Sequence, residues 1–387
     1  MRVVIAPDRF AGSLTAAEAA EAIARGWRAR APHDDLDLVP LSDGGSGFLD
    51  VLAPAVGGEM LAATVRDPLG TPVPATVLLA NRSGVPTAYL EAAQACGPHL
   101  VRSDRRSPAV TTSAGLGDLL GLALGAGARR IVVGVGEVAT HDAGAGLLAA
   151  LGAGPEHRLG RGGLALGDLT SDDLAGLAAT VDRFRGIELL LATADDHPLL
   201  GLQGTSAVEA QERGASADQA QELERSFGHL VGLVRQVRPP RTDLLTGAAR
   251  RLDKEAGAGA AGGIGWALFE LGGRRTSAVQ VVAEAVGLRA RLAGADLVVT
   301  GESSFDWRSL RGRVVAAVAE AALDVGVPSI VLAGEISVGR REAMAAGLSG
   351  TYAVAHRPVD LAAVLADPAG ALATRAARVA ATWSPAG

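Results

Sequence analysis

Acidic side chains in this 387-residue chain follow short apolar runs and stand among glycines. The segment 131–146 (IVVGVGEVATHDAGAG) holds Glu137, His141 and Asp142 inside a glycine-rich stretch. Bare backbone N–H groups of such a turn bind phosphate oxygens, whereas carboxylates repel phosphate and attract a hard cation such as Mg²⁺. The segment is therefore compatible with a phosphate loop, a metal site or a tight corner.

Four other segments place similar residues directly after an apolar run. They are 6–16 (APDRFAGSLTA) with Asp8, Arg9 and Ser13, 41–47 (LSDGGSG) with Asp43, Gly44 and Gly45, 300–306 (TGESSFD) with Thr300, Glu302 and Asp306, and 333–335 (AGE) with Glu335. Ligands of open α/β sheets bind at the carboxyl ends of the strands. We therefore expect these side chains to converge on one crevice, where glycine N–H groups bind phosphate and Asp142 binds a metal.

Familiar nucleotide motifs do not explain these segments. The motif G-x-x-x-x-G-K-[ST] is absent, because the sequence has a single lysine, Lys254. Residues 134–139 (GVGEVA) fit a dinucleotide fingerprint loosely, but Glu137 would face the pyrophosphate, which disfavours that interpretation. His141 and His197 each stand beside a carboxylate, which is typical both of a general base and of a hydrogen-bonded turn residue. Arg213 fits either a solvated cap or a ligand contact.

Composition restricts the classes of protein further. The net charge of −6 gives no basic field for nucleic acid, and 48% hydrophobic residues exclude extensive disorder. The single cysteine, Cys96, excludes an internal disulfide framework and a cysteine-based zinc site. Because no apolar run reaches the roughly 18 residues of a spanning helix and no leader opens the chain, we expect a soluble cytoplasmic protein with two or three domains.

The elements that position these residues follow an alternating pattern. A strand at 2–8, a helix at 13–32 with Thr15 and Glu18 in capping positions, and a strand at 35–45 favour a parallel sheet with helices on its faces. The strand pattern returns at 128–136, 294–302, 327–335 and, more weakly, at 350–358. We expect these strands to join the same sheet, built from both ends of the chain.

Residues 60–290 differ in sequence pattern from the segments around them, and this difference predicts an inserted second lobe. They are rich in strands, turns, Pro and Gly. They also include a long amphipathic helix at 216–237, with Ser216 and Gln219 in capping positions, and a glycine-rich start of a helix at 255–273.

Taken together, these segments resemble the two-lobed bacterial glycerate kinase family nearly from end to end. The opening VVIAPDRFAGSLTAAEAAEAI resembles the family's APDSFKGSL, LSDGGSG resembles ADGGEGT, and GVGEVATHDAGAGLLAALG resembles GIGGSATNDGGAG followed by LG. ATADDHPLLG resembles ACDVTNPLLG, QERGAS resembles PQKGA, and GAGAAGGIG resembles GAGAAGGLG. Finally, ADLVVTGESSFDWRSLRGR resembles ADLVITGEGRLDGQTLRGK.

The resemblance implies a fold and an activity. The fold is α/β: a Rossmann-like or flavodoxin-like parallel-sheet lobe of residues 1–60, about 125–200 and 290–387, with an inserted mixed α/β lobe of about 61–124 and 201–289. The implied site lies in a cleft between the lobes. The implied reaction transfers the γ-phosphate of ATP to a hydroxyl of D-glycerate or a related hydroxy acid, with Mg²⁺. The residues leave a monomer and a homodimer open.

The same resemblance implies the roles of the site residues. Catalytic roles are expected for Asp142, His141, Asp195 and Asp306, with His141 or Asp195 taking the hydroxyl proton. Substrate or phosphate contacts are expected from Arg9, Ser13, Asp43, Gly44, Gly45, Gly144, Gly146, Arg213, Thr300 and Glu302, and Mg²⁺ coordination from Asp43, Asp142 and Glu302.

Several positions depart from the family pattern. Arg9, Ala11, His141, Ala194 and Ser304 stand where the quoted family segments have Ser, Lys, Asn, Asp and Arg. Arg213 stands for a lysine, and Arg9 and Arg213 are expected to replace the lost positive charges, because Arg reaches phosphate bidentately.

Two rival hypotheses follow from the altered charges. One is a diverged relative that binds a nucleotide or an organic acid in a regulatory or scaffolding role without transferring phosphate. The other is an enzyme of different chemistry that uses His141 and His197.

Overall fold

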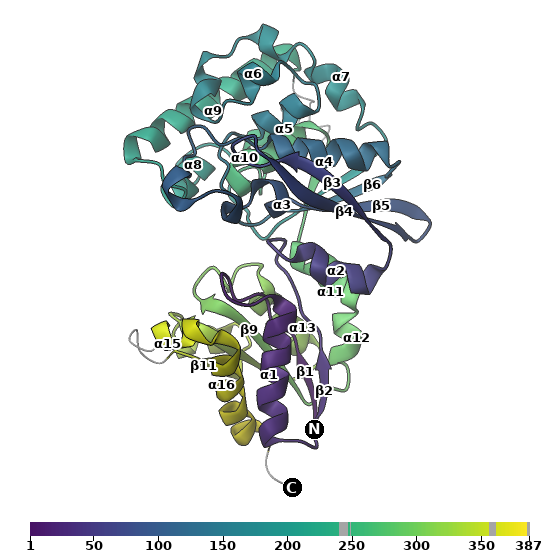
Figure 1. Ribbon diagram of the computed structural model, residues 1–387, viewed down its shortest axis with the longest axis vertical. Helices are drawn as coiled ribbons and strands as arrows, with labels where there is room; N and C mark the ends of the chain where they lie inside the picture. Colours follow the sequence, from purple (N-terminus) through teal and green to yellow (C-terminus); the bar gives the residue numbers. More distant parts are fainter. Residues whose placement is uncertain (240–246, 248, 356–360, 385–387) are drawn as a thin grey trace. The chain divides into compact units, whose positions relative to one another are not determined.

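The computed structural model describes residues 1–239, 247, 249–355 and 361–384 of the chain, which divide into two compact units (Figure 1). Unit 1 comprises Met1–Asp43, Asp50–Val56 and Ser277–Gly387. Unit 2 comprises Gly44–Leu49 and Gly57–Thr276.

Unit 1 is built on a parallel sheet of five strands in the order β11-β10-β9-β1-β2. The strands are β1 (Arg2–Ile5), β2 (Asp35–Leu38), β9 (Leu297–Phe305), β10 (Ser329–Ile336) and β11 (Gly350–Ala353). Val3, Val4 and Ile5 are fully buried, so β1 is covered on both faces, as parallel strands usually are. The strands expected at both ends of the chain thus meet in one sheet, which confirms the parallel-sheet lobe.

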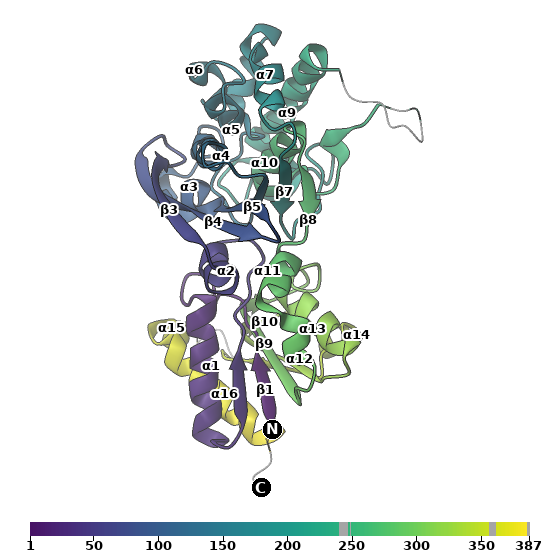
Figure 2. The same ribbon diagram turned by 90° about the vertical axis from the view of Figure 1, so that its right-hand side faces the viewer.

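Helices cover both faces of this sheet. The helices of unit 1 are α1 (Ala16–Arg30), α11 (Ala278–Val286), α12 (Leu288–Leu292), α13 (Val314–Asp324), α14 (Arg340–Ala345), α15 (Leu361–Ala366) and α16 (Pro368–Trp383). Both views show α1 and α16 side by side on one face (Figures 1 and 2). Gly26 permits this close contact, because a Cβ there would lie 1.9 Å from the backbone oxygen of Ala373.

The predicted capping box at the start of α1 is confirmed. Thr15 Oγ1 accepts from the Glu18 N–H at 3.2 Å, and Glu18 Oε2 accepts from the Thr15 N–H at 2.8 Å. We expect Thr15→Ala to lower the free energy of unfolding of unit 1 by about 1 kcal/mol, because the Glu18 N–H loses its side-chain acceptor. Denaturant unfolding measures this, with Thr15→Ser as the control that keeps the hydroxyl. An equal loss in both variants would contradict the capping role.

Unit 2 is built on a mixed sheet of six strands in the order β3-β4-β5-β6-β7-β8. The strands are β3 (Glu59–Arg66), β4 (Pro72–Arg82), β5 (Val85–Glu91), β6 (Arg130–Gly134), β7 (Glu188–Ala192) and β8 (Arg274–Thr276). The pairs β3–β4 and β4–β5 are antiparallel, whereas β5 to β8 run parallel. The expected mixed α/β second lobe is therefore confirmed.

Short helices and one long helix pack against this sheet and against one another. They are α3 (Ala93–Cys96), α4 (Ala114–Gly125), α5 (Ala145–Ala150), α6 (Glu156–Leu159), α7 (Leu177–Asp182), α8 (Thr205–Glu209), α9 (Ala217–Val237) and α10 (Ala260–Glu270). The long helix α9 starts at the predicted Ser216 box and buries Leu223, Phe227 and Leu230 in the core. Helix α2 (Phe48–Val56) has residues in both units.

The lobe boundaries differ from the expected ones. Strands β6 and β7 were expected in the first lobe, but they pair with β5 and β8 in the sheet of unit 2, so about 125–200 belongs to unit 2. Helix α11 lies in unit 1, so the chain returns to unit 1 at Ser277 and not near residue 290. Strand 128–136 thus shares the apolar sequence pattern of the strands in unit 1 but not their sheet.

Within the ranges given above, no helix combines the length and the apolar character that crossing a bilayer requires.

Candidate functional site

Unit 1 gathers carboxylates at the carboxyl ends of β1, β2 and β9. The Asp8 N–H donates to Gly301 O and the Leu41 N–H to Pro7 O, so the segments after these strands run side by side. This arrangement places the Asp43 carboxylate close enough to raise the pKa of both Asp8 and Glu302. Asp8 and Glu302 are each only 8% exposed. The expected convergence of Asp43 and Glu302 is therefore present, with Asp8 as a third member.

Burial and like charge act together on this carboxylate cluster of Asp8, Asp43 and Glu302. Burial, with the Asp43 and Glu302 charges, raises the pKa of Asp8 well above its ordinary value despite a hydrogen bond from the Arg9 N–H. Burial also raises the pKa of Glu302 to about 7, against the opposing effects of Ser309 and Arg313. Among the described residues, Glu302 Oε1 is buried without a hydrogen-bond partner. Such a cluster favours uptake of a proton or a cation.

Other predicted residues of unit 1 have local structural partners. Thr300 Oγ1 is fully buried and donates to Ala6 O at 2.8 Å, which ties β9 to β1. Ser13 Oγ donates to Phe10 O at 3.0 Å within the turn after β1. The fully buried Thr300 hydroxyl does not fit the expected phosphate contact, and the contact expected from Ser13 stays a prediction.

Two further predicted residues of unit 1 border the carboxylate cluster. Asp306 Oδ1 accepts from the N–H groups of Arg308 and Ser309 and so shapes the loop after β9. Arg9 follows Asp8 directly, and its N–H donates to Asp8 Oδ1 at 2.7 Å. Their expected catalytic and phosphate-binding roles stay predictions.

In unit 2, Asp142 organises the glycine-rich corner after β6. Its fully buried carboxylate accepts hydrogen bonds from the N–H and Oγ–H of Ser113 at 2.8 and 2.9 Å, and from the N–H groups of Gly144 and Gly146 at 3.0 and 3.1 Å. Burial raises the pKa of Asp142, while these hydrogen bonds oppose the rise. Gly144 has a φ of 71°, a left-handed conformation that favours glycine.

The structure of this corner distinguishes among the phosphate loop, the metal site and the tight corner with which its sequence is compatible. The N–H groups of Gly144 and Gly146, expected to bind phosphate, are occupied by Asp142. Asp142, expected to bind metal, has no exposed surface and is surrounded by donors. Both expectations are wrong for this structure, and the segment is a tight corner held by an internal carboxylate. The glycine N–H groups of Gly44 and Gly45 remain predicted ligand contacts.

His141 is also buried and fully hydrogen-bonded. Its Nδ1 lies 2.9 Å from Arg213 Nη1 and its Nε2 lies 3.1 Å from Ser206 Oγ, and the ring stacks on Phe227. Burial, followed by the Arg213 charge, lowers the pKa of His141 to about 3. Because Arg213 donates to Nδ1, that lone pair is unavailable for a substrate proton. The expected role of His141 as a catalytic base is therefore wrong for this arrangement.

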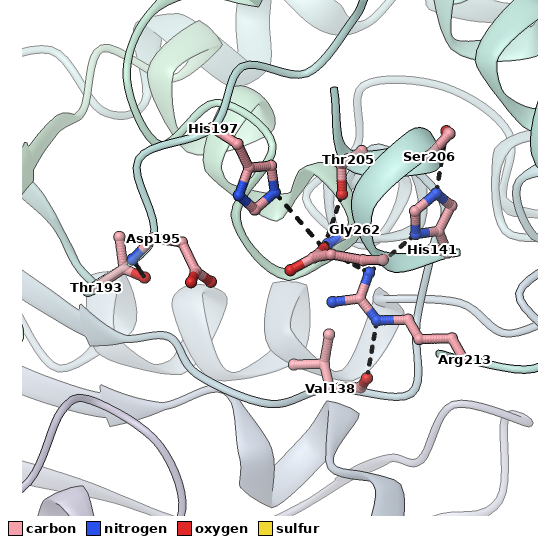
Figure 3. Close-up of polar contacts among 10 residues, drawn as sticks. Val138, His141, Thr193, Asp195, His197, Thr205, Ser206, Arg213 and Gly262 are labelled. Carbon is pink, nitrogen blue, oxygen red and sulfur yellow. Dashed lines mark hydrogen bonds and ion pairs between the residues drawn. The ribbon is translucent and has the colours of Figure 1, made fainter. Parts of the chain in front are cut away.

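Around Arg213 lies a second polar group, the Arg213 cluster of Asp195, His197, Glu209 and Arg213 (Figure 3). Glu209 Oε2 contacts Arg213 Nη1 at 2.8 Å and accepts from Thr205 Oγ1 at 2.8 Å, while His197 Nε2 lies 3.6 Å away.

The two titratable partners in this cluster stabilise each other's charged forms. Burial alone would raise the pKa of Glu209, but the charges of Arg213 and His197 hold it below its ordinary value. Burial likewise opposes the charged form of His197, yet Glu209 raises the His197 pKa. Glu209 is thus ionised.

Part of this cluster has the donor set of a metal site. Asp195, His197 and Glu209 offer ligand atoms that lie within 4.8 Å of one another. However, the Glu209 oxygen nearest His197 already contacts the Arg213 guanidinium. The arrangement therefore suits anion binding beside Arg213 better than cation binding.

Three residues that shape these sites are not among those predicted from the sequence. Glu209 stands four residues before Arg213, a spacing at which helical side chains pair, so a signal for it was present. Ser113 and Ser206 meet Asp142 and His141 through chain separations of 29 and 65 residues, for which one sequence carries no local signal.

Comparisons with known proteins agree with this architecture. The model of the glycerate kinase family matches residues 3–384. The glycerate kinase of Bacillus subtilis (strain 168) is 38% identical over 368 residues, 93% of this chain and 92% of the relative. The glycerate 2-kinase of Escherichia coli (strain K12) is 35% identical over 344 residues, 87% and 86% of the two chains.

A solved structure extends the similarity to the fold. A crystal structure assigned as glycerate kinase 2 from Salmonella typhimurium LT2 has a TM-score of 0.73 and 33% identity, and the match covers 99% of this chain and 98% of that one. Sequence and fold agree over nearly the whole chain, which therefore belongs to the glycerate kinase family.

Proposed function

We propose that this chain transfers the γ-phosphate of ATP to a hydroxyl of D-glycerate or a related hydroxy acid, with Mg²⁺. Family membership and the names of its relatives support the acceptor and the reaction type. The observation that carries the nucleotide half of the proposal is the carboxylate cluster of unit 1, since buried acidic groups of this kind suit the Mg²⁺ that accompanies ATP.

The residues of the carboxylate cluster fit a hard cation. Asp8, Asp43 and Glu302 supply only oxygen ligands, and the buried Glu302 Oε1 lacks a partner among the described residues. When bound there, Mg²⁺ would neutralise charge on the phosphate oxygens. Arg313, 4.0 Å from Asp43 in this structure, supplies a neighbouring positive charge for the same oxygens.

The Arg213 cluster of unit 2 supplies the groups that suit the acceptor. Arg213 provides a positive charge for a carboxylate, and Asp195 provides a carboxylate that can take the proton of the reacting hydroxyl. His141 has no part in that proton transfer, because its Nδ1 lone pair is occupied by Arg213.

An activity assay tests the proposal. Purified protein with ATP, Mg²⁺ and D-glycerate should release ADP and form phosphoglycerate, and chelation of Mg²⁺ should stop turnover. We expect Asp43→Asn to lower kcat/KM about 10- to 100-fold, because a charge-assisted contact to the cation is worth about 1.5–3 kcal/mol. Asp50→Asn is the control, since Asp50 is an exposed carboxylate on the same unit.

Two outcomes would contradict the proposal. A nucleotide-dependent rise in melting temperature without turnover would favour a binding protein that no longer transfers phosphate. Absence of both turnover and nucleotide binding would favour different chemistry at the Arg213 cluster.

A further inference from the structure

The guanidinium of Arg213 is held on two of its three nitrogens. Nη1 contacts His141 Nδ1 at 2.9 Å and Glu209 Oε2 at 2.8 Å, and Nε donates to Val138 O at 3.2 Å. No hydrogen bond within the described residues engages Nη2. Figure 3 shows this nitrogen directed to the side on which Asp195 and His197 lie, away from His141. The group is therefore fixed in orientation and presents one remaining N–H edge.

His141 can hold Arg213 only in one tautomer. An arginine in a protein stays protonated and has donors alone, so Nδ1 of His141 must accept. The ring proton is then on Nε2, which donates to Ser206 Oγ at 3.1 Å. Stacking on Phe227, with ring centroids 5.1 Å apart, fixes the plane of the ring. A buried, neutral imidazole thus acts as a rigid acceptor for the guanidinium.

We propose that His141 is a positioning residue, which holds Arg213 so that its Nη2 binds the carboxylate of the hydroxy-acid substrate. The inference rests on the proposed function and names the subsite within it. Glu209 already balances the Arg213 charge, and a single directional N–H edge remains. This suits one carboxylate, whereas a triphosphate requires several cationic contacts.

Two substitutions of His141 separate positioning from mere packing. The Asn Oδ1 stands where the His Nδ1 stands, so His141→Asn keeps an acceptor for Arg213 and loses the contact with Ser206. The Gln amide reaches the position of Nε2, so His141→Gln keeps the Ser206 contact and loses the acceptor. Both remove the stacking on Phe227 and are matched in that respect.

Steady-state kinetics on the full chain give the readout. We expect His141→Gln to raise KM for D-glycerate about tenfold, the loss of one hydrogen bond of ordinary strength. His141→Asn should stay within about threefold of the wild type. KM for ATP and kcat at saturating D-glycerate should change little in either. Arg213→Lys, which keeps a charge but lacks Nη2, should also raise KM for D-glycerate. This variant provides the test if a His141 variant does not fold.

Several results would overturn the inference. These are equal KM values in the Asn and Gln variants, a rise confined to KM for ATP, or a collapse of kcat at saturating D-glycerate in both variants, as expected for a catalytic base. If the wild type shows no turnover, the proposed function fails separately. Stabilisation by D-glycerate alone then tests the subsite: the wild type and His141→Asn should rise in melting temperature and His141→Gln should not, and no rise in the wild type overturns the inference.

Discussion

Replacing Asp142 with alanine is expected to lower the free energy of unfolding of unit 2 by about 4 kcal/mol, because buried donors lose their common acceptor. The orphaned groups are the N–H and Oγ–H of Ser113 and the N–H groups of Gly144 and Gly146. These donors are closed to bulk solvent, since Asp142 has no exposed surface. Calorimetry should show a fall in the melting temperature of unit 2 of about 10 °C.

Asp142→Asn provides the graded control. One amide oxygen can still accept the bonds made by Oδ2, but the amide NH₂ then faces the N–H of Gly144. We expect a loss of about 1–3 kcal/mol. Below its melting temperature, the Asn variant should keep turnover within about tenfold of the wild type. Abolished turnover in a folded Asn variant would restore the catalytic role that the sequence suggested.

Replacing Glu302 with glutamine is expected to stabilise the Mg²⁺-free protein at pH 8 while lowering turnover. Burial raises the pKa of Glu302 to about 7. A carboxyl group whose pKa is higher in the folded state contributes stability at low pH, and this stability is lost as the pH rises through the folded pKa. From pH 4 to pH 8 the loss is about 3 kcal/mol, at about 1.4 kcal/mol per pKa unit.

Denaturant unfolding in the presence of a chelator, repeated at several pH values, measures this effect. Asp8 and other buried carboxyl groups titrate as well, so the difference between the wild type and Glu302→Gln is the relevant quantity. That difference should be smallest near pH 4, below the ordinary pKa of a glutamate, and grow toward pH 8. Added Mg²⁺ should stabilise the wild type more at pH 8 than at pH 5, because ionised oxygens bind it better. A pH-independent difference would contradict the buried, proton-binding state of Glu302.

The sequence predicted local elements well, because their signals are local. The Thr15–Glu18 and Ser216–Gln219 boxes and the apolar strands stand where expected. The strands with which each strand pairs were harder to predict. Strand β6 has the same apolar texture as β9 and β10, and only its pairing with β5 and β7 assigns it to unit 2. Strand pairing is decided by packing between segments that are far apart in the sequence, and the local apolar pattern carries no information about it.

The site shows the same division. Acidic residues at strand ends correctly indicated that Asp43 and Glu302 lie near each other, since strand direction fixes where such residues gather, and their roles in binding stay predictions. The prediction that the Asp142 corner binds phosphate and metal was wrong for a different reason. Glycine N–H groups beside a carboxylate can face a ligand or that carboxylate, and the outcome depends on Ser113, 29 residues away.

The two units also differ in when synthesis could complete them. Strand β1 pairs with β9 through Val3 and Leu297, so the sheet of unit 1 must wait until β9 has left the ribosome. Nearly all of unit 2 is one continuous stretch, Gly57–Thr276, and it can fold while translation continues. The β1–α1–β2 segment therefore leaves the ribosome well before its neighbouring strand β9, and apolar residues such as Val3 and Ile5 are available to chaperones during that interval.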